Sequence, residues 1–341
     1  MSTVPLRDRV PAVAAPHPAD TAEVVWRAVQ PSDLDALMPL TRAIASVEHP
    51  EYVESREEIE SELAHSWMQL DEDSLLALDA RTGDPLAWGL VVAAPGSETL
   101  VRSILLGGVH PAARGRGLGR ALLNWQDARA QQQLATHAEA LPAWSIVYAD
   151  DRSSDKKRLL EGAGFTATRW FLGQERVIAD PIPEVPFDDG VSIVPFTTEL
   201  SEATRLAKSD AFRDHWGSQP TTREQWDAML ALPVFRPDLS FVAVDRAGSV
   251  VGLVMTETSH EDWELQGYSS GYITLVGVVR EWRRRGIAPA LLARVFHALA
   301  DAGIERAALD VDSVNPTGAL GLYSGMGFHT TTTVVAYTRE F

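Results

Sequence analysis

Two arginine- and glycine-rich turns carry the strongest chemical signal in this sequence. The first, 114–119, reads Arg-Gly-Arg-Gly-Leu-Gly, and the second, 283–288, reads Arg-Arg-Arg-Gly-Ile-Ala. Each follows an apolar run and precedes apolar residues at helical i, i+3, i+4 spacing. The first turn of a helix has N–H groups without intrahelical partners, and its dipole favours negative charge. Small residues allow close approach and arginines add charge-assisted hydrogen bonds, so both turns predict anion binding.

A second motif follows each turn in the same order. Roughly 45 residues after each turn, a short helical pattern ends in Gly-Phe, at 159–165 and at 322–328. The two turns themselves are roughly 170 residues apart, which is about one domain length. A pair of motifs that recurs in order, with similar internal spacing, indicates an internal duplication.

Other glycine-rich loops fit the two turns poorly. A Walker loop needs a Lys-Ser/Thr pair after its last glycine, and neither turn has one. A dinucleotide fingerprint needs G-x-G-x-x-G, whereas Gly115, Gly117 and Gly119 are spaced G-x-G-x-G. A nucleic-acid site is disfavoured because the basic cluster 283–285 lies in an otherwise acidic chain.

Both turns match the R/Q-x-x-G-x-G/A pattern of the GNAT acyltransferase superfamily. The first turn fits as Arg114, Gly117 and Gly119, and the second as Arg283, Gly286 and Ala288. From about residue 23 to its end, the chain resembles a tandem GNAT protein and is similar in layout to the mycothiol synthases. The resemblance implies that each loop can hold the pyrophosphate of acetyl-CoA, the expected co-substrate. The cofactor-binding residues that it implies are Val276, Val278, Arg283, Arg284, Arg285, Gly286, Ile287, Ala288 and Asn315 in the second half, and Val109, Arg114, Gly115, Arg116, Gly117, Leu118 and Gly119 in the first.

The two halves differ in the residues that could perform chemistry. GNAT enzymes commonly keep a tyrosine that reprotonates the departing CoA thiolate, and an asparagine that contacts the cofactor arm. The resemblance places these at Tyr323 and Asn315. Alignment of the Gly-Phe motifs puts Leu160 where Tyr323 stands, and leucine has no proton to give. We therefore expect the C-terminal half to be catalytic, and the N-terminal half to be degenerate while still able to bind acyl-CoA.

The general base is less clearly marked, because the acceptor amine must lose a proton before it attacks. Glu257, at the end of an expected strand, is the favoured candidate, with Glu261, Asp262 and Glu264 in a polar loop after it. A strand position that often carries glutamate in relatives holds Tyr272 instead. We assign Tyr272 to the acceptor site.

A further cluster, 210–217, is expected to form part of the acceptor wall. Asp214 could hold a cationic amine, His215 could relay protons, and Trp216 could cover the substrate. The alternative is a capped helix end with a packed tryptophan. Two adjacent ligands do not make a metal site, so we expect no metal.

The order of strand and helix patterns predicts an α/β fold with a mixed sheet. By resemblance it consists of two tandem GNAT-like domains, each a splayed mixed sheet flanked by helices. The expected boundaries are a disordered leader at 1–21, an N-terminal domain at 22–179, a linker at 180–190 and a C-terminal domain at 191–341. The linker is expected because three prolines and three aspartates resist both helix and central strand.

Composition limits the function further. The net charge is −17, there are no cysteines, and no apolar run approaches the ~18–20 residues that a membrane span needs. We expect a cytoplasmic monomer or homodimer that binds neither nucleic acid nor membrane and takes a small-molecule amine as acceptor. The predicted activity is acetyl transfer from acetyl-CoA to a primary amine by direct attack. The alternatives are a mycothiol-synthase-like acetylation of a cysteinyl amino-sugar, and a non-catalytic acyl-CoA sensor or assembly module.

Overall fold

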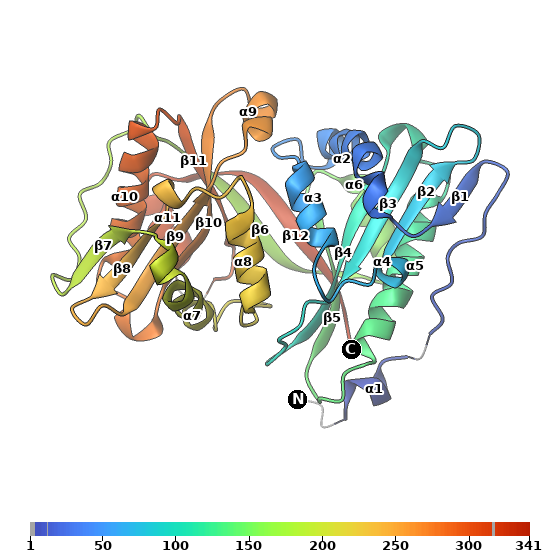
Figure 1. The fold of residues 1–341 in the computed structure, drawn as a ribbon, viewed down its shortest axis with the longest axis horizontal. Coiled ribbons are helices and arrows are strands. Elements are labelled where there is room, and N and C mark those ends of the chain that lie inside the picture. The colour runs from blue at the N-terminus through green and yellow to red at the C-terminus, as the bar shows by residue number, and fades with distance from the viewer. Residues whose placement is uncertain (1–3, 12, 316–317) are drawn as a thin grey trace. The chain divides into compact units, whose positions relative to one another are not determined.

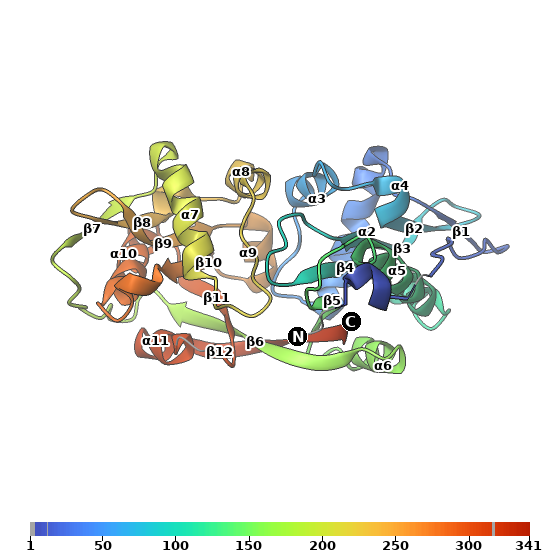
Figure 2. The same ribbon diagram turned by 90° about the horizontal axis from the view of Figure 1, so that it is seen from below.

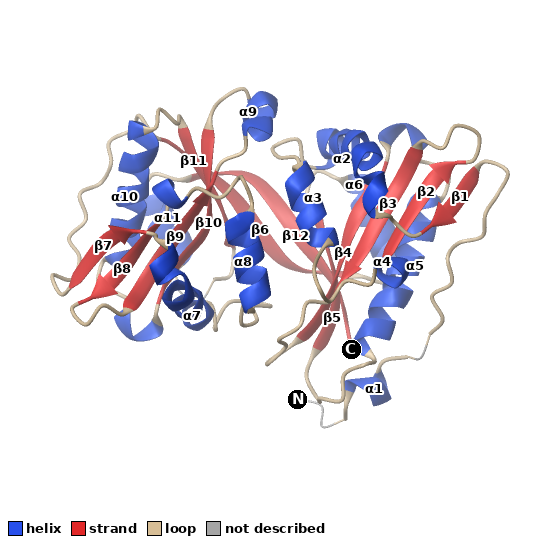
Figure 3. Ribbon diagram, viewed as in Figure 1, coloured by secondary structure: helices blue, strands red, loops and turns tan. Residues whose placement is uncertain are grey.

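The computed structural model describes residues 4–11, 13–315 and 318–341, and the chain divides into two compact units. Unit 1 comprises Met1–Arg169 with Val334–Phe341, and unit 2 comprises Trp170–Thr333. Both are mixed sheets with helices packed on them, as Figures 1, 2 and 3 show, so the predicted fold class is confirmed.

In unit 1 the strand order is β1-β2-β3-β4-β5-β12. Its helices are α1 (Leu6–Arg9), α2 (Leu34–Glu48), α3 (Arg56–Leu63), α4 (Leu70–Asp73), α5 (Leu118–Leu134) and α6 (Ser154–Gly162). Its strands are β1 (Val24–Arg27), β2 (Ser74–Asp79), β3 (Pro85–Val92), β4 (Val101–Val109) and β5 (Ala143–Asp150), joined by the last part of β12 (His329–Glu340).

In unit 2 the strand order is β6-β11-β10-β9-β8-β7. Its strands are the greater part of β6 (Thr166–Val177), β7 (Val191–Pro195), β8 (Phe241–Asp245), β9 (Val250–Glu257), β10 (Ser270–Val278) and β11 (Arg306–Asp312). Its helices are α7 (Ser201–Ala211), α8 (Arg223–Ala231), α9 (His260–Gln266), α10 (Ile287–Asp301) and α11 (Ala319–Gly325).

Each sheet has a fork between two parallel strands. In unit 2 the recorded pairing of β10 with β11 runs only from Ser270↔Arg306 to Tyr272↔Ala308. In unit 1 the pairing of β4 with β5 ends at Ile104↔Ile146. Beyond these residues β10 and β4 continue toward the arginine-rich turns without a recorded partner on that side. These forks are the splay that the resemblance implied.

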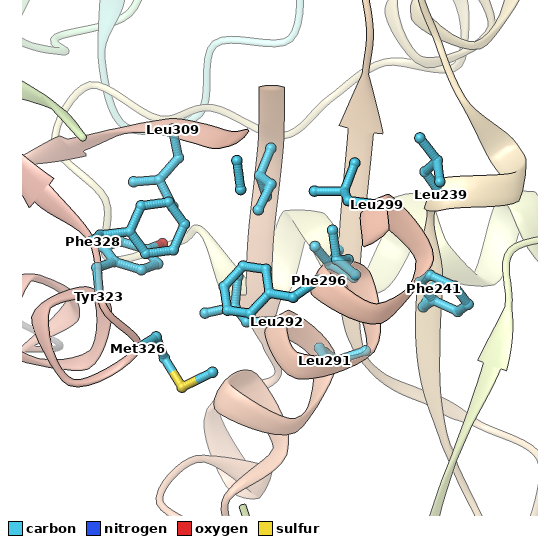
Figure 4. Packing of buried hydrophobic residues seen from close by; sticks show 14 of the residues in the cluster. Leu239, Phe241, Leu291, Leu292, Phe296, Leu299, Leu309, Tyr323, Met326 and Phe328 are labelled. Atoms are coloured by element: carbon cyan, nitrogen blue, oxygen red, sulfur yellow. The ribbon is translucent and has the colours of Figure 1, made fainter. Parts of the chain in front are cut away.

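Helix α10 is the central helix of the unit 2 core. Gly286, in the left-handed region at φ 76°, precedes it, and its apolar face is fully buried. That face comprises Leu291, Leu292, Val295, Phe296 and Leu299, all at 0% exposure. Burial of each such side chain contributes about 1.5–3 kcal/mol relative to exposure. Figure 4 shows several of them beside Phe328 and Tyr323, in one cluster with Leu309 of β11.

The last strand of each half pairs in the unit formed mainly by the other half. Strand β6 pairs antiparallel with β11 over Phe171–Val177, and β12 pairs with β5 over Val334–Glu340. The compact units therefore divide differently from the expected boundaries at 179 and 191. Periodicity predicted the strands but could not show which sheet each one joins.

Two arginines on these exchanged strands hold the two Gly-Phe turns in equivalent ways. In unit 2, Arg176 is buried, donates to the Met326 carbonyl oxygen at 2.5 Å and lies over the Phe296 ring. In unit 1, Arg339 donates to the Ala163 carbonyl oxygen and lies over the Phe165 ring. The Met326 and Ala163 positions are equivalent, each two residues before the phenylalanine of its turn.

The expectation of a disordered leader is wrong for residues 6–10. Helix α1 lies there, with Leu6 fully buried and Val10 nearly so, in a cluster with Val101, Leu134 and Ala143. The Pro- and Ala-rich composition obscured this short amphipathic segment. Residues 1–3 and 12 lie outside the described part of the chain.

We predict that Arg176→Leu lowers the free energy of unfolding by about 2–4 kcal/mol, measured by urea denaturation. The reason is that Arg176 also donates to the carbonyl oxygens of Asp180 and Pro181, at 2.9 Å each, so three main-chain acceptors would lose their donor. Arg158→Leu is the control, because Arg158 is 72% exposed and pairs only with Asp155 among recorded contacts. Equal effects of the two substitutions would contradict this role of Arg176.

Candidate active site

The arginine-rich turn of unit 2 contains two left-handed residues just before the start of α10. Arg284 (φ 62°) and Gly286 (φ 76°) both adopt left-handed conformations. In unit 1 the equivalent residues, Gly115 (φ 78°) and Gly117 (φ 85°), do the same. When left-handed residues alternate with residues of negative φ, successive N–H groups point toward one place, and this arrangement favours binding of an anion. The shape of both turns therefore fits a pyrophosphate group.

Arg284 is the one non-glycine residue with positive φ among the residues that the structure describes. A left-handed conformation costs a side-chain-bearing residue roughly 1–2 kcal/mol, so glycine at the equivalent position in unit 1 is the relaxed solution. Unit 2 instead has Arg284 in this strained conformation. Its turn therefore contains three arginines, whereas the turn of unit 1 contains two.

The first arginine of each motif points away from the predicted pyrophosphate position. Arg283 donates to the carbonyl oxygens of Val278 (3.2 Å) and Ala211 (2.9 Å), which ties the loop to the end of α7. Arg114 likewise approaches the Val109 carbonyl oxygen and pairs with Glu48 at 2.7 Å. We therefore interpret both as residues that position the loop.

The linker packs against the unit 2 loop. A Cβ added at Gly286 would collide with the Pro186 carbonyl oxygen. Asp188 receives a hydrogen bond from Arg285 at 3.2 Å, and its own N–H donates to the Arg285 carbonyl oxygen. Glycine at position 286 is thus required by the linker as well as by the left-handed turn.

The edge of β10 that faces the fork can accept an extended ligand. The Val279 N–H points to β9, where it donates to Val251 at 2.9 Å. Because backbone groups alternate along a strand, those of Val278 and Val276 point to the other side, where β11 has diverged. Val276 and Val278 therefore stay the predicted residues along the cofactor arm.

A bulge interrupts β10 close to the fork. The register with β9 shifts between Ile273 and Leu275, which leaves Thr274 without a pairing partner. The Thr274 hydroxyl is buried and has no hydrogen-bond partner within the described chain. A bound carbonyl oxygen would satisfy such a donor. No comparable shift interrupts the recorded β3–β4 register in unit 1.

Tyr323 and Leu160 occupy equivalent positions in the two units. The N–H of Phe328 donates to the Tyr323 carbonyl oxygen, and that of Phe165 donates to Leu160, each at 3.0 Å. Both side chains are buried, Tyr323 at 8% and Leu160 at 1% exposure. Burial raises the pKa of Tyr323 to about 12, so the phenol keeps its proton at neutral pH. Figure 4 shows its ring beside Phe328, on the α10 side of the sheet.

The structure brings together two residues that the sequence assigned to different roles. Asn315 Nδ2 lies 3.0 Å from His215 Nε2, which requires that nitrogen to act as the acceptor. Trp216 packs against Phe171 with 6.1 Å between ring centroids. The predicted acceptor wall therefore meets the turn after β11. Pro316, which follows Asn315, lies outside the described residues.

The contacts of Asp214 argue against the amine binding that we expected for it. Its carboxylate pairs with Arg283 at 3.1 Å and with Arg280, and these guanidinium groups hold the pKa of Asp214 below its usual range. An aspartate already paired with two cations is a poor site for an ammonium group. We assign it to positioning of the loop.

Sequence reasoning missed Asp310, which lies beside Tyr272. The Tyr272 hydroxyl donates to Asp310 Oδ2 at 2.8 Å, and Tyr272 pairs in register with Glu257 on β9. No motif signalled Asp310, because only the register of β10 and β11 places it at the fork. The other base candidates, Glu261, Asp262 and Glu264, lie on helix α9 rather than in the expected loop.

Unit 1 lacks several of these features. Glu48 at the end of α2 is buried and pairs with both Arg114 and Lys156, the latter at 2.8 Å. This carboxylate holds Arg114 beside the turn, as Asp214 holds Arg283 in unit 2. With Leu160 in place of the tyrosine, unit 1 has the turn without the proton donor.

The comparisons with known proteins identify the family of this chain. A model described as the acetyltransferase (GNAT) family matches residues 201–328, which lie in unit 2. A mycothiol acetyltransferase of Thermobispora bispora is 32% identical over 232 residues, which are 68% of this chain and 74% of the relative. The chain belongs to the GNAT family of acetyltransferases. As a GNAT acetyltransferase it transfers an acetyl group from acetyl-CoA to an amine.

Other relatives extend the likeness over nearly the whole chain. A mycothiol acetyltransferase of a Nocardioides species is 28% identical over 79% of this GNAT acetyltransferase and 90% of the relative. The crystal structure of a GCN5-related N-acetyltransferase from Sphaerobacter thermophilus superposes with a TM-score of 0.69 at 26% identity, covering 93% of this chain and 95% of that one. A tandem GNAT protein from the clavulanic acid pathway shares the fold, with a TM-score of 0.66 at 16% identity over 93% of this chain and 98% of that one.

This GNAT acetyltransferase has neither a metal-binding cluster nor a membrane-spanning helix among its described residues. Among residues 4–11, 13–315 and 318–341, no group of three or more histidine or acidic side chains is arranged to hold a metal ion. Within the same residues, no helix has the length and apolar character needed to cross a membrane.

We predict that Arg284→Gly and Arg284→Ala both raise the KM for acetyl-CoA several-fold, because each removes a cation from the pyrophosphate loop. Glycine also relieves the left-handed strain, so Arg284→Gly should have the higher melting temperature of the two. Steady-state kinetics and thermal unfolding separate charge from strain. An unchanged KM in both variants would contradict the assignment of Arg284.

Proposed function

We propose that acetyl transfer takes place in unit 2, and that unit 1 is non-catalytic. The observation that carries this proposal is the equivalence of Tyr323 and Leu160. The two turns make the same backbone hydrogen bond and bury the same position, yet only one of them supplies a proton donor. The bulge at Thr274 and the match of the family model to residues 201–328 support the same unit.

In this proposal the turn 283–288 binds the pyrophosphate with its N–H groups, together with Arg284 and Arg285. The cofactor arm follows the free edge of β10 past Val278 and Val276 into the fork. Acetyl-CoA supplies a thioester, whose carbonyl oxygen the Thr274 hydroxyl and nearby backbone N–H groups can polarise. Tyr323 protonates the departing sulfur as the amine takes the acetyl group.

We predict that Tyr323→Phe lowers kcat by about 10²–10⁴-fold, while the dissociation constant for acetyl-CoA changes little. The phenol acts on the leaving group and does not hold the nucleotide, which is why binding should survive. Release of the CoA thiol and calorimetric titration measure the two quantities.

Tyr337→Phe is the matched control, because Tyr337 is a buried tyrosine of unit 1 that bonds only to Glu161 among recorded contacts. Its turnover should remain near that of the wild type. Normal turnover of Tyr323→Phe, or equal losses in both variants, would overturn the assignment of chemistry to unit 2.

We further infer that the acceptor is a small molecule with a primary amine, and the most specific candidate is a cysteinyl amino-sugar. The relatives named mycothiol acetyltransferase, at 28–33% identity, favour it. Incubation with acetyl-CoA and a cysteinyl glucosamine, read by mass spectrometry, should show one acetyl group on the cysteinyl nitrogen. Turnover of simple alkylamines without turnover of this compound would support another small amine. Binding of acetyl-CoA without thiol release from any amine would support the sensor alternative.

A further inference from the structure

Three polar side chains lie side by side on one face of unit 2, across the base of the fork. Glu257 on β9 is the register partner of Tyr272 on β10, and Tyr272 donates to Asp310 on β11. The side chains of Ile273 and Leu309 belong to the core cluster under α10. Because side chains alternate along a strand, Tyr272 and Asp310 face the opposite side, toward α7.

Asp310 is the first residue on that face of β11 beyond the last pair formed with β10. The recorded pairing stops at Tyr272↔Ala308, and Asp310 is two residues further on. Asp310 keeps an exposed surface at this point, and Tyr272 is 37% exposed. From Val278 back to Ile273 the free edge of β10 is roughly 17 Å long. An acyl group carried down that edge therefore ends beside Asp310.

Tyr323 packs against β11 from the opposite face of the sheet, under α10. It belongs to the cluster under α10 that contains Leu309, the residue next to Asp310. A phenol and a carboxylate thus lie on opposite faces of the sheet, next to the opening between the strands. This arrangement suits a reaction that needs a proton given on one side and taken on the other.

We propose that Asp310, oriented by Tyr272, accepts the proton that the acceptor ammonium must lose before it attacks. This inference rests on the proposed function of unit 2. The carboxylate takes a proton from the ammonium nitrogen, whose lone pair then forms the bond to the acetyl carbon. The carbon–sulfur bond breaks, and the sulfur receives the proton of Tyr323. Tyr323 regains a proton from the acylated nitrogen, and Asp310 returns its proton to solvent.

The surroundings of Asp310 suit this role. Partial burial of the carboxyl raises its pKa, whereas the hydrogen bond from Tyr272 lowers it. The nearest charged groups on the same face by register are Glu257, Arg306 paired with Glu175 at 2.6 Å, and Asp312.

The residues of β6 and β12 that lie beside Asp310 are small and uncharged. Asp310 pairs in register with Gly173 of β6, where a Cβ would lie 3.3 Å from Asp310 Oδ1. The same Cβ would collide with the Thr332 hydroxyl of β12, which therefore lies close to Gly173. Neither Gly173 nor Thr332 carries a charge.

Asp310 is better placed than Glu257, the base that the sequence favoured. Glu257 stands on β9, so β10 and the Tyr272 side chain lie between it and the opening. Asp310 stands on β11, which is one of the two strands that form the opening. Glu257 can still attract a cationic acceptor toward the site.

The test is the pH dependence of kcat/KM for CoA thiol release, with cysteinyl glucosamine as acceptor. In the wild type, kcat/KM should fall as pH drops through the pKa of Asp310, because the carboxylate form is needed. Asp310→Asn should lower kcat by at least 10²-fold. It should also abolish the fall of kcat/KM at low pH, which is the acidic limb of the pH profile. Its dissociation constant for acetyl-CoA, from calorimetry, should stay within about twofold, which shows that the fold and the cofactor site are intact.

Two further variants distinguish a proton acceptor from a structural residue. Tyr272→Phe removes the hydrogen bond that lowers the pKa of Asp310, so the acidic limb should move to higher pH. Glu257→Gln should leave the limb in place. A limb that persists in Asp310→Asn, or one that disappears in Glu257→Gln instead, would overturn the inference.

The outcomes separate this inference from the proposed function. Wild-type protein that releases thiol, together with an Asp310→Asn variant that keeps wild-type turnover and pH profile, refutes the role of Asp310 alone. Wild-type protein that releases no thiol with this acceptor or with alkylamines refutes the proposed function, and the role of Asp310 with it.

Discussion

The end of pairing between β10 and β11 is the constraint on which the rest of unit 2 depends. Parallel strands that stay paired leave no room for a ligand, whereas these two separate after Tyr272 and Ala308. The separation frees the edge of β10, where Val276 and Val278 can face an extended ligand, and it places Thr274 and Asp310 at the base of the opening. Arg283 and Asp214 then tie the arginine-rich turn to the end of α7, so that this turn lies at the far end of the same edge.

The exchanged strands make the core of each unit depend on residues from both halves of the chain. Unit 2 needs β6 from the first half, because Arg176 is buried under the Gly-Phe turn that follows Tyr323. Unit 1 needs β12 from the second half, where Arg339 holds the equivalent turn. The first half, which has leucine in place of Tyr323, therefore remains necessary for the core of unit 2, since its last strand completes that core.

The sequence predicted the features that depend on local spacing. The two turns, the helices that follow them and the α/β order all appear, because glycine placement and 3.6-residue periodicity act over a few residues. It missed the features that depend on partners distant in the chain. Asp310 carries no motif, Asp214 is occupied by Arg280 and Arg283, and β6 and β12 exchange units. The equivalence of Tyr323 with Leu160 came from the sequence alignment of two short motifs, and the shared backbone hydrogen bond supports it.

Hydrogen exchange of backbone amides, with and without acetyl-CoA, tests the central claim most directly. A pyrophosphate held by the second turn and an arm along the fork should slow exchange at residues 284–288 and 276–278. The equivalent amides at 115–119 are the comparison, because unit 1 has the same turn without the tyrosine and without the register shift of β10. Protection confined to 115–119, or absent from both turns, would contradict the assignment of acetyl transfer to unit 2.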